Sequence, residues 1–348
     1  MTALPANIDS LLVTYQPNVR YLTGFTGSCG CVLITRRRRY FFSDFRYRDQ
    51  AAKEVKDFAV NLVRGGLLPG LCRFLRARRL KLGTLGVESS RLSHSDFLLL
   101  RRLLKGVSIR DAGGIIEKQR QVKNGQEVDR IRRASSIADA ALEKLRRYKV
   151  TGRTEKEVAW LLESFMRQDG SGPLPFDIIV ASGPRSAMPH GIAGDRVINK
   201  GEPVVIDMGA TVDGYCCDIT RTFATGSLSS RQQKIYRTVG EAQELAIQAA
   251  EPGAACAGVD KLAREHITAA GFGEAFGHSL GHGVGLEAHE GPLLAPGSVD
   301  TLASGMTITI EPGIYTGRTG VRIEDTVLVT GTGAEALTVF PRRLLILK

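Results

Sequence analysis

The feature that most constrains this chain is a group of acidic residues and histidines confined to its second half. Asp207 and Asp218 lie in the segment VVIDMGATVDGYCCDITRTF, and His282 lies in FGHSLGHGVGLEAHEGP. Glu311 and Glu324 follow in MTITIEPGIY and GVRIEDTVLV. Four carboxylates and one imidazole form an oxygen-rich ligand set that suits a pair of divalent ions such as manganese or zinc. Because two such ions can bridge a water molecule and lower its pKa, the sequence points to a dinuclear metal hydrolase.

The spacing of the two aspartates supports this interpretation. Asp213 and Gly214 form a strong two-residue hairpin turn, with apolar and β-branched residues on both sides. If these two residues are the loop, Gly209 lies opposite Asp218, and Asp207 is a diagonal neighbour of Asp218 on the same face. Diagonal cross-strand Cα atoms are roughly 7–8 Å apart, and the side-chain tips are closer. Two carboxylates at that distance repel each other unless a cation lies between them, so we expect a metal site here.

The two glutamates repeat this arrangement. The run MTITIEPG predicts a strand that carries Glu311 and stops at Pro312, and VRIEDTVLVT predicts its neighbour, which carries Glu324. Arg322 is two residues before Glu324 and therefore on the same strand face. It can orient a carboxylate or a substrate carbonyl by bidentate hydrogen bonding. Asp325 points the opposite way and is not expected to be a ligand.

The histidines divide into two groups. His266 lies in an amphipathic helix that ends at Gly271, and we expect it to be an ordinary surface or boundary residue, as we do His94. The segment GHSLGHGVG has too many glycines for a helix, so its histidine spacing is not the helical zinc motif. A glycine-rich loop instead allows the backbone to approach a metal site closely. Four histidines lie in segments of this kind, punctuated by glycine or proline: His190, His278, His282 and His289.

The pattern along the chain predicts a two-domain α/β protein. Its 348 residues suit about two domains, and 43% hydrophobic residues without a long apolar stretch indicate a globular protein. Residues 1–115 alternate short strands, CVLIT and YFFSD, with helical stretches, which predicts a small α/β domain. Residues 116–348 would form the catalytic domain.

Within the catalytic domain, a helix from about residue 126 carries apolar residues at helical spacing. Thr154 and Glu157 form a capping-box pattern that begins the next helix. Two more helices, near 231–250 and 258–270, precede the second pair of carboxylate strands. This duplication predicts an α+β domain with pseudo-twofold symmetry, whose metals lie at the junction of the two halves.

Composition argues against several other classes of protein. The net charge of +11 includes the run Arg36–Arg39, but that run lies between two apolar segments and reads as a strand connection. Other basic residues alternate with leucine as on solvated helix faces, so we expect no nucleic-acid partner and no membrane. The first residues lack the pattern of a secretory signal, and the cysteines lack zinc-knuckle spacing, which favours a cytoplasmic protein. Cys216 shares a strand face with Asp218, but we expect it to be a packed bystander.

The motifs DMGA, DITRTF, HSLGHGVGL with a following HE, IEPGIY and VRIEDT resemble, in this order, those of the pita-bread metallopeptidases. That family includes methionine aminopeptidase, prolidase and aminopeptidase P. The segments ASGPRSAMPHG, NVRYLTGFTGS and FFSDFRYRDQA are similar to the Xaa-Pro branch of the family. The resemblance implies two divalent ions, for which we expect manganese, with zinc, cobalt and iron as alternatives. It assigns as their ligands Asp207, Asp218, His282, Glu311 and Glu324.

The resemblance also implies roles for the residues around the metals. A bridging water would attack the scissile carbonyl, and Glu311 would accept its proton. His190 and His289 would donate hydrogen bonds to the carbonyl or to the oxyanion, each worth roughly 2.7–4 kcal/mol in the transition state. His278 would bind the substrate beyond the cleaved bond. Together with Arg322, these are the expected catalytic residues.

The implied substrates are proline-containing peptides with a free N-terminus, and the implied assembly is a homodimer. Phe176 and Tyr315 match positions that line the substrate pocket in the family, although plain core aromatics would give the same pattern. A strict dipeptidase must also bind the free carboxylate of the substrate proline, and some compact prolidases place an arginine shortly after the HE motif. Here that stretch has Leu293 and Leu294, and no arginine or lysine.

We therefore predict a metal-dependent Xaa-Pro aminopeptidase. The alternative is an Xaa-Pro dipeptidase, or prolidase, and a remote alternative is a non-enzymatic pita-bread module that binds peptides or nucleic acid. Loss of metal ligands would indicate such a module, and none of the five ligands is lost.

Overall fold

In the computed structural model, which describes residues 4–348, the chain forms two compact units. One ends at Arg120 and the other runs from Gln121 to Lys348. The predicted two-domain α/β organisation is confirmed, with the division after Arg120 rather than after residue 115. No helix within residues 4–348 is long and apolar enough to span a membrane.

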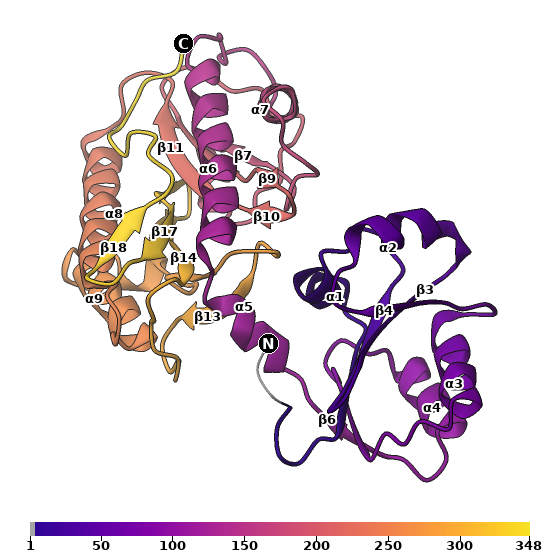
Figure 1. Cartoon of the computed structure of the whole chain (residues 1–348). Coiled ribbons are helices and arrows are strands. Elements are labelled where there is room, and N and C mark those ends of the chain that lie inside the picture. Colours follow the sequence, from indigo (N-terminus) through magenta and orange to yellow (C-terminus); the bar gives the residue numbers. More distant parts are fainter. Residues whose placement is uncertain (1–3) are drawn as a thin grey trace. The chain divides into compact units, whose positions relative to one another are not determined.

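The amino-terminal unit is a mixed sheet with helices on both faces (Figure 1). Its strand order is β4-β3-β2-β1-β5-β6, and β1 runs parallel to β5 but antiparallel to β2. Arg36–Arg38 connect β2 to β3, which begins at Arg39, so the run forms a strand connection as predicted. The elements are β1 (Ser10–Val13), α1 (Gln16–Thr23), β2 (Cys31–Thr35), β3 (Arg39–Ser43), α2 (Arg48–Glu54), β4 (Ala59–Leu62), α3 (Leu67–Ala77), β5 (Thr84–Val87), α4 (His94–Leu103), β6 (Ser108–Asp111) and α5 (Ile115–Gln121).

The alternation of side chains along the strands explains why this sheet is covered twice. Leu33 of β2 packs in one apolar cluster with Leu71 of α3 and Leu100 of α4. Its neighbour Val32 packs in another cluster, with Val19 of α1 and residues of α2. Successive residues of a strand point to opposite faces, so each face of the sheet has its own core.

The catalytic unit contains the same series of elements twice, namely two helices followed by a β-hairpin that changes direction part of the way along. The first half comprises α6 (Gly125–Leu145), α7 (Glu155–Gln168), β7 (Ile179–Ser182), β8 (Pro203–Met208), β9 (Thr211–Val212), β10 (Tyr215–Cys216) and β11 (Ile219–Ala224). The second half comprises α8 (Ser230–Ala249), α9 (Cys256–Ala269), β12 (Gly281–Gly283), β13 (Glu290–Leu294), β14 (Thr307–Ile310), β15 (Gly313–Thr316), β16 (Thr319–Arg322), β17 (Asp325–Val329) and β18 (Ala334–Ala336). The predicted pseudo-twofold organisation is confirmed.

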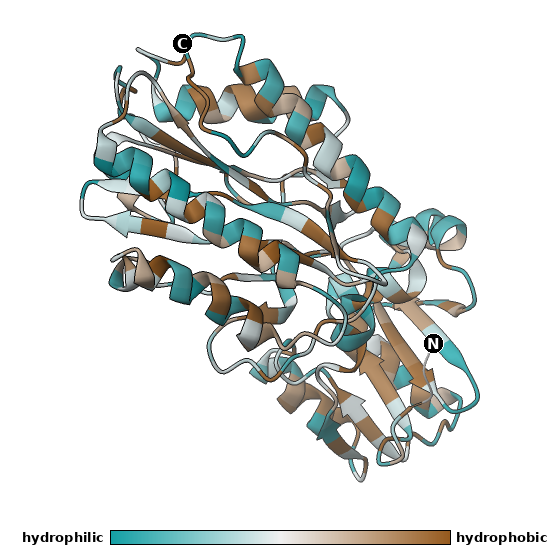
Figure 2. Cartoon of the chain, turned by 90° about the vertical axis from the view of Figure 1, so that its left-hand side faces the viewer, coloured by the Kyte–Doolittle hydropathy of each residue, from teal (hydrophilic) through white to brown (hydrophobic). Residues whose placement is uncertain are grey.

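The helices of the catalytic unit begin where the sequence provides caps. The Thr154 hydroxyl accepts a hydrogen bond from the Glu157 amide, and the Glu157 carboxylate accepts one from the Thr154 amide, so the predicted capping box begins α7. Equivalent boxes begin α6 and α8. The helices carry polar and apolar residues in alternation along their length (Figure 2). The apolar bands of α6 and α7 pack on β8 and β11, and those of α8 and α9 pack on β14 and β17.

Candidate metal centre

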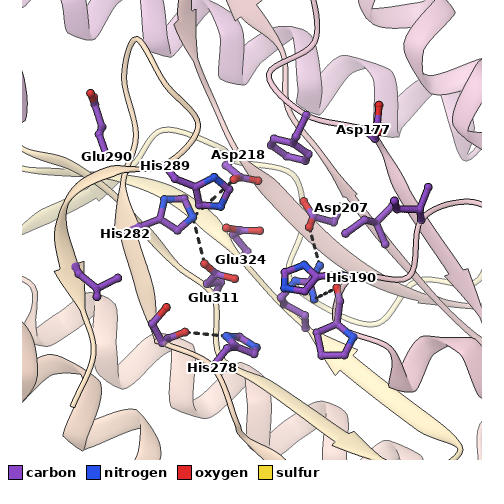
Figure 3. A pocket seen from close by; sticks show the side chains of 17 residues that line it. Asp177, His190, Asp207, Asp218, His278, His282, His289, Glu290, Glu311 and Glu324 are labelled. Atoms are coloured by element: carbon purple, nitrogen blue, oxygen red, sulfur yellow. Dashed lines mark hydrogen bonds and ion pairs between the residues drawn. The ribbon is translucent and has the colours of Figure 1, made fainter. Parts of the chain in front are cut away.

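A cavity of about 530 Å³ in the catalytic unit brings together most of the residues that the sequence singled out (Figure 3). Its wall contains ten of them: Phe176, His190, Asp207, Asp218, His278, His282, His289, Glu311, Arg322 and Glu324. A cavity of this size suits a small ligand. The residues come from both halves of the unit, so the cavity lies at the junction that the duplication predicted.

The hairpin of the first half has the predicted register. Asp213 and Gly214 both have positive φ, 47° and 80°, as a type I′ turn requires. The pairing continues without a slip to Asp207, which lies opposite Thr220. Counting along it places Gly209 opposite Asp218. A Cβ atom at Gly209 would lie 2.3 Å from the Cys217 carbonyl oxygen, so only glycine fits where the strand turns.

The hairpin of the second half places the glutamates in a corresponding way. Ile310 pairs with Asp325 and Gly313 pairs with Arg322, so the register puts Glu311 opposite Glu324 between two ladders. The Glu324 amide donates to the Thr220 carbonyl oxygen at 3.0 Å, which joins this hairpin to the first one. All four carboxylates therefore meet where the two hairpins lie side by side.

His282 completes the cluster with its ring already oriented. It is buried on β12, and its Nδ1 lies 3.0 Å from the carbonyl oxygen of Gly283. This contact favours a proton on Nδ1, so that Nε2 faces the carboxylates. There Nε2 can offer its lone pair to a metal or, when the ring is protonated, donate to Glu311. Nε2 is 3.3 Å from Glu311 Oε1 and 4.0 Å from Asp218 Oδ2. Figure 3 shows these side chains facing one another.

The electrostatics of the cluster favour a bound cation. Burial raises the pKa values of Asp218 and Glu324 well above their ordinary range, and repulsion by the neighbouring carboxylates raises them further. Burial acts in the same direction on Glu311 and is the largest single influence, but the hydrogen bond with His282 and the charges of His282, His278 and Arg322 together outweigh it, so the pKa of Glu311 is lowered. Two buried carboxylate oxygens, Asp207 Oδ1 and Asp218 Oδ1, have no hydrogen-bond donor within residues 4–348.

A divalent ion fits this donor set. Asp218, His282 and Glu324 each offer one ligand atom, and these atoms lie within 4.8 Å of one another. The two orphaned aspartate oxygens face the same cavity. Oxygen-rich sets with one imidazole suit manganese, iron, cobalt and zinc.

Arg322 binds a carboxylate, as predicted, but with one nitrogen rather than two. Its Nη2 donates to Asp207 Oδ2 at 2.6 Å, and Nη1 donates to the Tyr315 hydroxyl at 2.7 Å and to the Pro189 carbonyl oxygen at 3.1 Å. Nε donates to the Thr220 hydroxyl at 3.1 Å. The guanidinium thus fixes Asp207 and is itself fixed by three other groups.

The other three histidines of the cavity wall differ in exposure and in their contacts. His190 and His289 are exposed, and the His289 ring lies 4.3 Å from that of His282. Burial, and then the neighbouring His282, lower the pKa of His289. His278 is half-buried, with Nδ1 2.8 Å from the Ser279 carbonyl oxygen and Nε2 3.1 Å from the Tyr315 hydroxyl. Burial lowers the pKa of His278, which favours its neutral form.

The other residues singled out in the sequence lie partly on and partly off the cavity wall. Phe176 lines the cavity. Tyr315 is not among the described lining residues, because its hydroxyl is engaged by Arg322 and His278 behind the wall. Cys216 is buried with its sulfur 3.8 Å from the Thr211 hydroxyl, and it does not line the cavity. Asp325 points away, as predicted, and receives hydrogen bonds from four side chains: Arg221, Gln243, Thr338 and Arg342.

Sequence reasoning missed several residues of the site. Thr220 donates to Glu324 Oε2 at 2.6 Å, and a two-residue periodicity from Asp218 could have indicated it. Thr220 does not itself line the cavity, and the lining residues to which the sequence assigned no role are Asp177, Ile179, Pro189, Ile192, Ser279, Glu290 and Leu293. Pro189, Ser279 and Glu290 lie in the motifs quoted above, although no role was assigned to them, and most of the others are apolar or lie in irregular segments.

Fold and site together define a metal-dependent peptidase with the pita-bread fold. Residues 129–331 match Metallopeptidase family M24, and residues 5–122 match the Creatinase/Prolidase N-terminal domain. The chain therefore belongs to metallopeptidase family M24 and carries the amino-terminal domain found in creatinase and prolidase. Membership of this family implies the use of divalent metal.

Similar proteins extend over the full length of the chain. The Xaa-Pro dipeptidase of Pyrococcus horikoshii is 38% identical over 342 residues, which cover 97% of this chain and 95% of that protein. The structure of an Xaa-Pro dipeptidase from Bacillus anthracis matches with a TM-score of 0.94 and 41% identity, covering 98% of this chain and 95% of the other. The structure of an X-Pro aminopeptidase from Thermotoga maritima matches with a TM-score of 0.90 and 38% identity, covering 98% of each chain. These matches confirm the resemblance to the Xaa-Pro branch.

Proposed function

We propose that this protein is a dinuclear Xaa-Pro dipeptidase, which hydrolyses the bond before proline in dipeptides. The observation that carries the proposal is the cluster of four carboxylates and His282 at the wall of a cavity of about 530 Å³. Two relatives that match nearly the whole chain are named Xaa-Pro dipeptidases. This proposal replaces aminopeptidase by dipeptidase as the leading activity, because those relatives favour the alternative drawn from the sequence.

The five predicted ligands, Asp207, Asp218, His282, Glu311 and Glu324, would hold two divalent ions, for which we propose manganese. When bound, the ions supply Lewis acidity and lower the pKa of a coordinated water. Arg322 would keep Asp207 Oδ2 in place so that Oδ1 faces the ions. Thr220 would do the same for Glu324 through its hydrogen bond to Oε2.

The chain's own groups would handle the protons and orient the substrate. Glu311 would accept a proton from the attacking water, because its lowered pKa keeps the carboxylate charged and able to act as a base. His190 and His289, which are exposed on the cavity wall, would donate hydrogen bonds to the scissile carbonyl. The neutral His278 and Phe176 would form the side of the pocket that receives the proline ring.

A second candidate, Xaa-Pro aminopeptidase, is favoured by the scarcity of lysine and arginine side chains on the cavity wall. Among the described lining residues, Arg322 is the only lysine or arginine, and its guanidinium is taken up by Asp207, Tyr315 and Pro189. Leu293, at the position where a cation was sought, is 49% exposed. An aminopeptidase does not need to bind the carboxylate of proline, and the similar protein from Thermotoga maritima is named an X-Pro aminopeptidase.

Hydrolysis of three matched peptides separates the two candidates. Ala-Pro carries a free carboxylate, Ala-Pro-amide differs only in the loss of that charge, and Ala-Pro-Ala extends the chain. A dipeptidase cleaves Ala-Pro much faster than the amide and the tripeptide. Faster cleavage of Ala-Pro-Ala, with the amide also accepted, would identify an aminopeptidase. No cleavage of any of the three by manganese-loaded protein would refute both.

A further inference from the structure

The segment that carries His278 is held from behind by a side-chain pair of helix α9. Residues 276–280 have no regular secondary structure and connect the short 3-10 helix Gly273–Ala275 to β12. Arg264 Nε and Nη2 donate to the two carboxylate oxygens of Asp260, at 2.8 and 2.7 Å. The Asp260 side chain is only 1% exposed. A bidentate, buried pair of this kind has a fixed geometry.

The pair binds three backbone groups of this segment. Arg264 Nη1 donates to the Phe276 carbonyl oxygen at 2.8 Å, and Nη2 donates to the carbonyl oxygen of His278 itself at 2.9 Å. The Leu280 amide donates to Asp260 Oδ1 at 3.1 Å. The Arg264 guanidinium also lies 4.2 Å from the centre of the Phe276 ring, which contacts the His278 ring edge-to-face. The backbone and the ring of His278 are thus both tied to α9.

The first half of the catalytic unit holds His190 in a corresponding way. Glu155 of α7 is fully buried and accepts hydrogen bonds from the amides of Ser182 and Gly194, at 2.8 and 3.1 Å. It also accepts one from Arg185 Nε, and Arg185 Nη2 donates to the Ile192 carbonyl oxygen. In both halves, a buried acid of the second helix therefore works with an arginine to fix the irregular segment that carries a histidine of the cavity. The arginine lies on that helix in the second half and on the 3-10 helix Gly183–Ala187 in the first.

We propose that Asp260 and Arg264 are positioning residues for His278. This inference rests on the proposed function in assigning His278 a place beside the substrate. Neither residue lines the cavity, so their effect on the reaction passes through the segment that they hold. Without Arg264, two carbonyl groups lose a charged donor, and the buried Asp260 loses its cation. The His278 ring would then be held only on its other side, by Ser279 and Tyr315, and its position would shift.

The competing explanation is that the pair only stabilises α9. The same helix contains a matched control, since Lys261 and Glu265 form a pair with the same four-residue spacing. Their atoms are 3.7 Å apart, and their side chains are 70% and 65% exposed. Replacing Lys261 therefore tests the loss of a helical ion pair without loss of the contacts to residues 276–280.

The first experiment is a double-mutant cycle with Arg264→Met, His278→Ala and the combined variant, using the fastest-cleaved of the proline peptides. We expect Arg264→Met to lower kcat/KM by about 10- to 100-fold, because misplacement of a group beside the substrate costs this much. His278→Ala should also lower it, and the combined variant should be no slower than His278→Ala alone. Lys261→Met should leave kcat/KM unchanged. Losses that multiply in the combined variant would overturn the proposal.

Asp260→Asn provides a second variant should Arg264→Met fold poorly, because it keeps the shape and removes only the charge. It should reproduce the loss, and both variants should retain the wild-type metal content. If kcat/KM fell as expected but bound metal were also lost, the effect would lie on the metal ligands, and the role proposed for His278 would be overturned.

The imidazole NMR signals of ¹⁵N-histidine-labelled protein provide a readout that does not depend on activity. The His278 signal, assigned from His278→Ala, should shift in Arg264→Met and stay in place in Lys261→Met. An unchanged His278 signal in Arg264→Met would refute the inference even in an active enzyme. An inactive wild-type protein with a shifted signal would instead refute the proposed function alone.

Discussion

Arg322 Nη2 donates to Asp207 Oδ2 at 2.6 Å, while Asp207 Oδ1 is buried without a donor within the described part of the chain. One oxygen of the carboxylate is therefore fixed by protein and the other is left for a ligand. The Arg322 side chain is only 4% exposed, so this pair lies in a region of low dielectric, where removal of one partner leaves an uncompensated charge. This relationship explains how an arginine can lie beside a cation site without competing for it.

Replacing Arg322 by glutamine should therefore impair catalysis rather than only the fold. We expect kcat/KM to fall by about 100-fold, because Asp207 loses its fixed orientation. Steady-state kinetics on Ala-Pro would measure this. Arg318→Gln, which alters an exposed arginine near the tip of the same hairpin, should have no effect. Equal activity of the two variants would remove Arg322 from the site.

Glu324→Gln should abolish turnover in a folded protein. The substitution keeps the shape of the side chain and its hydrogen bond with Thr220, but it removes a charge that the proposed ions need. Metal content by mass spectrometry and hydrolysis of Ala-Pro should fall together. Glu335→Gln, at a surface pair with Arg132, is the control and should retain both. Full activity of Glu324→Gln would exclude Glu324 as a ligand.

Metal should stabilise the protein more strongly as pH rises. Burial and neighbouring carboxylates raise the pKa values of Asp218 and Glu324. Without metal, these carboxylates therefore ionise at a lower pH in the unfolded chain than in the folded protein. Their contribution to the stability of the folded protein falls as pH rises from their ordinary pKa values towards the raised ones. Bound cations remove this penalty. Manganese should raise the thermal midpoint more at about pH 7.5 than at about pH 5.5, measured by scanning fluorimetry against chelator-treated protein. An equal rise at both pH values would contradict this expectation.

Gly209→Ala should destabilise the protein by about 1–3 kcal/mol, the usual cost of overpacking. The added Cβ would lie 2.3 Å from the Cys217 carbonyl oxygen and 2.7 Å from Pro175 Cγ. Urea denaturation would measure the free energy of unfolding. Gly125→Ala, in helix α6 with open space around the added carbon, should be neutral or stabilising. Similar stabilities of the two variants would show that the turn at Gly209 tolerates a side chain.

The parts of the site that follow local rules could be predicted from the sequence. The type I′ turn at Asp213 and Gly214 fixes the register of the first hairpin, and the register places Asp207 diagonally across from Asp218. Pro312 interrupts the second hairpin between β14, which ends at Ile310, and β15, which begins at Gly313, and Glu311 precedes it. Each of these signals lies within a few residues of the ligand that it positions.

Contacts between distant segments could not be predicted in this way. The sequence predicted that Tyr315 lines the substrate pocket. Its hydroxyl instead binds Arg322 and His278, and it is not among the described lining residues. The pair of Asp260 and Arg264 reads as an ordinary ion pair on a helix face, and its hydrogen bonds to residues 276–280 are visible only in three dimensions. Periodicity assigns a face to a side chain, but it does not identify the segment that will pack against that face.

A titration of metal-free protein with manganese tests the central claim most directly, with bound metal and Ala-Pro hydrolysis followed in the same samples. We expect hydrolysis to be absent without metal, to rise with bound manganese, and to reach its maximum at about two ions per chain, as a two-metal site requires. Full hydrolysis by protein that contains no metal, or bound manganese without hydrolysis of any proline peptide, would contradict it.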